Sequence, residues 1–129
     1  MRLKFLNFII NLLIFLTFTS SSLASSINVN GLLISAFWIK AASGNHKMTS
    51  GYLTIENTNN FDEHLVSLTS EISKKTQIHD MVVQNDIMKM KNLEGGVLIK
   101  AYSKVRFRPG SYHIMFMKLK KPIIVMNKY

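Results

Sequence analysis

Short runs of alternating apolar and polar residues dominate the sequence after residue 25. A two-residue period is typical of strands with one buried face, and turn signals roughly every ten residues are typical of an antiparallel sandwich or barrel. We therefore expect a single all-β domain, in which only residues 70–75 could take a helical turn. The expected strands lie at 35–39, 52–56, 64–69, 76–83, 87–91, 97–99 and 112–117.

The first 24 residues follow a different pattern. Arg2 and Lys4 precede an apolar run over 5–16, and small residues follow as far as Ala24. This order is typical of a secretory signal peptide, so we expect residues 1–24 to be cleaved after Ala24 and the protein to reach the periplasm. The alternative is an uncleaved membrane anchor, although two asparagines interrupt a run shorter than the ~20 residues of a spanning helix. The mature domain would be 25–129.

Charge and cysteine content narrow the chemistry that this domain can carry. The chain has 16 basic and 7 acidic residues and a net charge of +9, which favours anionic partners such as lipid headgroups or an acidic protein face. The lysines are scattered and do not form a patch with interleaved aromatic residues, so we expect no nucleic-acid partner. The absence of cysteine excludes thiolate zinc sites, redox disulfides and cysteine-centred blue-copper sites. No nucleophile or acid–base pair stands out, so we do not expect an enzyme.

Thioether and imidazole donors remain, and they are concentrated in the last third of the chain. Residues two apart share one face of a strand. The donors that share a face in this way are His79 with Met81, Met88 with Met90, and His113 with Met115 and Met117. We expect the two His-x-Met strands to be neighbours with Met90 between them. Such soft donors favour Cu(I) over zinc, magnesium or calcium, but methionines also fill cores, so the pattern alone leaves a copper site and simple packing both open.

At these positions the chain resembles the periplasmic copper chaperones of the PCu(A)C family. The hallmark of that family is a histidine, ten residues, a methionine, a little over twenty residues and then His-x-Met. Here His79 is followed by ten residues and Met90, and then by twenty-two residues and His113-Ile114-Met115. The likeness covers about Ile34 to Val125. It extends to the segments Gly51-Tyr52-Leu53-Thr54-Ile55-Glu56-Asn57, His79-Asp80-Met81, Glu94-Gly95-Gly96, Pro109-Gly110 and Tyr112-His113-Ile114-Met115.

The resemblance implies a fold, a site and a function. The fold would be a cupredoxin-like Greek-key β-barrel or sandwich with a solvent-accessible Cu(I) site. The function would be Cu(I) delivery by ligand exchange toward the binuclear copper centre of cytochrome c oxidase, with the copper-bearing subunit of that enzyme or a Sco-type copper protein as partner. The implied copper ligands are His79, Met90, His113 and Met115, while Met81, Met88 and Met117 would be packing residues or neighbours of the site.

Two further expectations follow from the sequence. Some relatives carry a His/Met-rich tail that this chain lacks, so we expect no second, Cu(II)-type site; His46 and Met48 are candidates for auxiliary binding. The rival reading is a basic exported module that binds an anionic lipid or protein, with the methionines as core packing. Membrane association is expected only if the signal peptide stays uncleaved.

Overall fold

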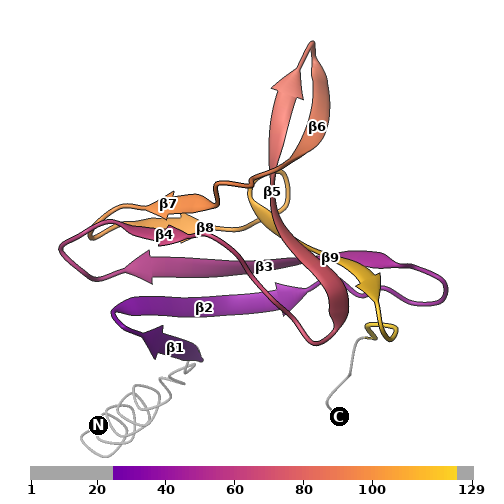
Figure 1. Ribbon diagram of the computed structural model, residues 1–129, viewed down its shortest axis with the longest axis horizontal. Coiled ribbons are helices and arrows are strands. Elements are labelled where there is room, and N and C mark those ends of the chain that lie inside the picture. The colour runs from indigo at the N-terminus through magenta and orange to yellow at the C-terminus, as the bar shows by residue number, and fades with distance from the viewer. Residues whose placement is uncertain (1–24, 125–129) are drawn as a thin grey trace, which may run out of the picture.

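The computed structural model describes residues 25–124, which form nine strands and no helix (Figure 1). The all-β prediction is confirmed. The expected signal peptide over 1–24 lies outside the described residues, as do residues 125–129. The strands are β1 Ser26–Val29, β2 Leu32–Ile39, β3 Met48–Asn57, β4 Glu63–Leu65, β5 Ser73–Gln84, β6 Ile87–Asn92, β7 Val97–Ile99, β8 Lys104–Arg106 and β9 His113–Leu119. Across 25–124, no helix is present that has the length and apolar character to cross a membrane.

Seven of these strands form one antiparallel sheet with the order β1-β2-β3-β9-β5-β6. The strand β8 joins the same edge of β3 as β9, because β9 pairs with 48–51 and β8 pairs with 54–56. The remaining strands, β4 and β7, pair with each other in a separate two-stranded sheet. The strands at 35–39, 52–56, 76–83, 87–91, 97–99 and 112–117 are therefore confirmed, although most of them extend further than the apolar pattern indicated.

The core lies between the large sheet and the β4–β7 pair. Ile99 on β7 is 1% exposed and packs with residues of the large sheet, among them Ile114 and Phe116 of β9. Because side chains alternate along a strand, the burial of these two β9 residues turns Met115 and Met117 to the opposite face. The predicted two-sided character of residues 112–117 is thus correct.

Three local predictions are wrong. Residues 70–75 contain no helical turn. Glu71 and Ile72 lie in a non-helical turn, and β5 already begins at Ser73. There the edge of β9 offers hydrogen-bond partners that a helix would forgo, with Ser73 opposite Leu119. The strand expected over 64–69 ends at Leu65. Strands β1 and β8 were not predicted, because β1 is exposed at every position and β8 has a single apolar residue, so neither has an apolar pattern that indicates a buried face.

The β5–β6 hairpin projects from the rest of the molecule (Figure 1). Its two-residue connection, Asn85-Asp86, has positive φ angles of 54° and 59°, which matches the type I′ turn favoured between tightly paired strands. Gln84 lies directly opposite Ile87, so the turn sets the register of the whole hairpin. This register decides which β6 residue lies beside each donor of β5.

Candidate metal site on the β9–β5–β6 face

The two predicted histidine ligands lie side by side. His79 on β5 is directly opposite His113 on β9, and their ring centroids are 5.6 Å apart with an angle of 75° between the ring planes. Directly opposite residues of an antiparallel pair carry their side chains on the same face. Strands far apart in sequence thus bring two imidazoles into one cluster.

The two predicted methionine ligands flank this histidine pair from opposite sides. Met115 lies opposite Gln77, one step along β9 from His113. Met90 on β6 lies opposite Met81, while Asn92 is the residue opposite His79. The His-x-Met strands are neighbours as predicted, but β5 lies between β9 and β6. The expectation that Met90 would lie between the two His-x-Met strands is wrong.

The exposed fraction of the side chain differs strongly among the four predicted ligands. The His113 side chain is 4% exposed, whereas Met90 is 58% exposed on the edge strand of the hairpin. His79 and Met115 are half-buried between these limits. The predicted ligand set therefore has a buried imidazole at one end and an exposed thioether at the other. The solvent-accessible site that the resemblance implied stays a prediction.

Among residues 25–124, each imidazole makes hydrogen bonds through only one of its ring nitrogens. The Nδ1 atom of His113 is 2.9 Å from the Ser111 carbonyl oxygen, so Nδ1–H donates and Nε2 carries the lone pair. The Nε2 atom of His79 is 3.4 Å from Gln77 Oε1, and the buried Nδ1 atom has no hydrogen-bond partner among the described residues. Metal-binding histidines characteristically donate the other ring N–H to an oxygen acceptor, so both residues fit a metal ion.

The electrostatic surroundings keep His79 neutral. Burial lowers its pKa below the ordinary 6.5, and the neighbouring His113 and then Lys75 lower the pKa further. A neutral imidazole is the form that binds metal, so this environment favours coordination at neutral pH. Within residues 25–124, no group of three or more His, Cys, Asp or Glu side chains is arranged to hold a metal ion. The other soft donors beside the pair are the thioethers of Met81, Met90 and Met115.

The lowered pKa of His79 predicts a pH dependence of stability in the metal-free protein. On acidification below pH 6.5 the unfolded chain takes up a proton at this residue before the folded chain does, so unfolding becomes more favourable. The contribution is complete above 6.5 and is lost as the pH falls toward the lower folded-state value. Urea midpoints measured between about pH 5 and 7.5 should fall on the acid side, and His79→Gln should flatten that fall. An equally steep profile in the variant would contradict the assignment.

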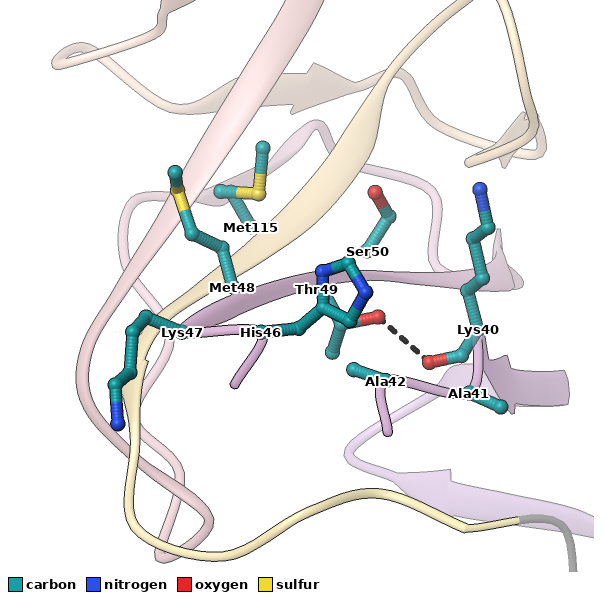
Figure 2. Close-up of a pocket in the computed structure, with 9 residues that line it drawn as sticks. All are labelled: Lys40, Ala41, Ala42, His46, Lys47, Met48, Thr49, Ser50 and Met115. Carbon is teal, nitrogen blue, oxygen red and sulfur yellow. Dashed lines mark hydrogen bonds between the residues drawn. The ribbon is translucent and has the colours of Figure 1, made fainter. Parts of the chain in front are cut away.

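Sequence reasoning missed the polar residues around the histidines. Gln77 could have been found, because it lies two residues before His79 and therefore shares its face. Asn92 could not, since its place opposite His79 depends on the register that the Asn85-Asp86 turn imposes. The auxiliary candidates His46 and Met48 line a pocket of about 490 Å³ together with Met115 (Figure 2).

The chain shares its fold with solved PCuAC domains. The apo PCuAC domain from PmoF1 has a TM-score of 0.64 and 22% identity, covering 78% of this chain and 79% of that one. The copper-bound PCuAC domain from PmoF2 has a TM-score of 0.61 and 17% identity, covering 81% and 77% of the two chains. The predicted cupredoxin-like fold is confirmed, and so is the resemblance to this family.

The sequence comparison gives the particular family. The profile described as "Putative lipoprotein LpqE-like" matches residues 32–129, and the chain belongs to this family. A protein described as a "Putative lipoprotein" from Leifsonia xyli subsp. xyli (strain CTCB07) is 33% identical over 94 residues, which cover 73% of this chain. The matched region covers 55% of that relative, so the chain spans little more than half of its length. The four copper ligands stay a prediction.

Proposed function

We propose that this protein is an exported, non-catalytic Cu(I) carrier that binds the ion on the β9–β5–β6 face. One observation carries the proposal. His79 and His113 form a cross-strand pair in which each ring has a nitrogen lone pair without a hydrogen-bond partner in the described part of the chain, and thioethers flank that pair on the same face. The copper-bound state described for the PmoF2 domain, which shares this fold, supports copper as the ion.

The proposed ligands are His79, Met90, His113 and Met115. All four are neutral and soft or borderline donors, a set that stabilises monovalent copper over zinc, magnesium or calcium. The buried His113 is held in place by its hydrogen bond to Ser111, so it serves as a rigid anchor for the ion. The long, unbranched methionine side chains adapt their reach from either side of the histidine pair.

Release would proceed from the exposed end of this ligand set. Met90 is 58% exposed on β6, an edge strand of the projecting hairpin, where an incoming ligand of a partner protein can approach (Figure 1). A partner thiolate or imidazole would replace the Met90 thioether while the two histidines still hold the ion. Neither the charge of copper nor the fold of the donor has to change in this exchange.

The periplasm is the proposed location, and the binuclear copper centre of cytochrome c oxidase is the proposed destination. The basic, apolar and then small-residue order of 1–24 supports export, as does the lipoprotein description of the family. The PCuAC-type fold supports a carrier role, with the copper-bearing oxidase subunit or a Sco-type protein as acceptor. Mixing copper-loaded protein with each isolated acceptor tests this step, and copper that stays on the donor at equilibrium with both would remove the proposed destination.

An anaerobic Cu(I) titration against a chromogenic chelator tests the function itself. We expect one tight equivalent, and Met90→Leu should weaken it by about tenfold because a thioether donor is replaced by an apolar group of similar volume. The matched control is Met88→Leu. Met88 is also 58% exposed and shares its strand and face with Met90, but it lies opposite Val83, two residue pairs further from the histidines.

The results of this titration distinguish the copper carrier from a basic module that binds an anionic partner. Equal effects of Met90→Leu and Met88→Leu would remove Met90 from the ligand set. The absence of any tight Cu(I) equivalent would leave the rival reading, in which the methionines pack and the basic surface binds an anionic partner.

A further inference from the structure

A third His-x-Met unit remains unused by the proposed site. His46 and Met48 have the same spacing as the units that begin at His79 and His113. Met48 begins β3 and His46 lies two residues before it, whereas the other two units lie on β9 and β5. The strands β3, β9 and β5 are consecutive neighbours in the sheet. Three of the four histidines of the chain are therefore followed two residues later by a methionine, and those three methionines lie on adjacent strands.

The strand register places the methionine of this third unit on the same face as the proposed copper site. Met48 is directly opposite Met117, and the next pair on that face is Ser50 with Met115. Met48 is thus the diagonal neighbour of Met115, within reach of a long side chain. His46 lines the same pocket as Met48 and Met115, and Figure 2 shows the two methionine side chains on the same side of β3.

A buried hydrogen bond at the start of β3 keeps the Met48 side chain on the exposed face of the strand. Thr49 points to the other side of the strand, is 6% exposed and donates a hydrogen bond from its hydroxyl to the Lys40 carbonyl oxygen at 2.6 Å (Figure 2). Because side chains alternate, a buried and anchored Thr49 directs Met48 outward, where it is 57% exposed. A large apolar side chain is therefore kept in solvent at a pocket that His46 also lines.

We propose that His46, Met48 and Met115 form a second, outer position for a soft monovalent ion next to the histidine pair. One imidazole and two thioethers are the donor types that select Cu(I), and Met117 lies opposite Met48 as a further thioether. The inference rests on the proposed function for the role of Met115, which both positions share. An ion that enters at the outer position reaches the His79–His113 pair by exchange at this one sulfur, without a redox step.

Nearby charge makes the outer position weak and selects the monovalent ion. Lys40 and Lys47 line the pocket, and Lys75 lies opposite Met117 on β5. The repulsion from these ammonium groups is twice as large for a divalent ion as for Cu(I) at equal distance. Figure 2 shows the end of Lys47 directed away from both sulfur atoms, and Lys40 at the opposite side of the pocket from them.

An anaerobic Cu(I) titration of the protein labelled with ¹³C at its methionine methyl groups tests the inference. Cu(I) is diamagnetic, so each methyl signal can be followed through the titration. The first equivalent should shift Met90 and Met115, and the second should shift Met48 and Met115. His46→Ala with Met48→Leu should leave the first equivalent intact and weaken the second by about tenfold or more. Both residues are exposed, so the variant should fold normally.

The double variant His64→Ala with Met88→Leu is the matched control. It removes an exposed histidine of β4 and a methionine with the exposure of Met48, and both equivalents should bind as in the unchanged protein. A second equivalent that is unaffected by the His46/Met48 variant, or that shifts Met88 in place of Met48, would overturn the inference.

The same titration separates failure of the outer position from failure of the proposed function. A single equivalent that depends on His79 and His113 would refute the outer position and leave the proposed copper site standing. A single equivalent that depends on His46 and Met48 and not on the two other histidines would refute the proposed site and support the outer position.

Discussion

Replacing His113 and Met115 together by alanine should weaken the tight Cu(I) equivalent by at least about a hundredfold. The change removes the most buried imidazole of the cluster and the neighbouring thioether, so His79 is left without its partner across the β5–β9 pair. Competition with a chromogenic Cu(I) chelator under anaerobic conditions measures the loss. His64→Ala, on the separate β4–β7 sheet, is the control that should keep full affinity.

Packing and ligation can be separated in this experiment. His113 is 4% exposed, so its truncation also leaves a cavity and is expected to cost folding free energy. Met115→Leu conserves volume and should keep the urea midpoint close to that of the unchanged protein while it weakens copper binding by about tenfold. Full affinity in both the double variant and Met115→Leu would exclude this face as the tight site.

Alanine at Gly96 should lower the free energy of unfolding by about 3 kcal/mol. Gly96 has a φ angle of +75°, and a Cβ atom there would lie 2.2 Å from the carbonyl oxygen of Leu65 and 2.8 Å from Cα of Val66. Both are backbone atoms at the end of β4, so the clash cannot be relieved by rotation of a side chain. Relief would have to separate β4 from β7, which carries the fully buried Ile99.

The neighbouring glycine supplies the control for this prediction. A Cβ atom at Gly95 would meet nothing within 4 Å, and Gly95→Ala should change the free energy of unfolding by no more than about 0.5 kcal/mol. Urea unfolding followed by circular dichroism measures both variants. Similar midpoints for the two would show that the contact between Gly96 and β4 does not constrain the fold.

Much of the fold was predictable because strand alternation is a local property. The pattern over 112–117 correctly separated Ile114 and Phe116, which pack in the core, from Met115 and Met117 on the other face. The local pattern gave the wrong structure over 70–75, because the polar run there was compatible with a helical turn. Pairing with β9 makes residues from Ser73 onward a strand. Gly95 and Gly96 are adjacent and identical in the sequence, and only the approach of β4 distinguishes them.

The candidate site was also predictable only where it depends on local strand geometry. Spacing along one strand showed that His79 shares a face with Met81, and His113 with Met115, because this depends only on the backbone of each strand. The sequence could not show that His79 lies opposite His113, since that register joins segments more than thirty residues apart.

The sequence by itself determined the chemical character of the donors: neutral imidazoles and thioethers, no thiolate, and their grouping by face within each strand. Only the tertiary structure decided that β9 runs between β3 and β5, which adds Met48 to the donor face and places Met90 beyond β5. It also placed His46 in the pocket that Met48 and Met115 line. It also decided that His113 is buried while Met90 is open. The physical reason is that strand order and burial arise from packing between distant segments, whereas alternation follows from the geometry of a single extended chain.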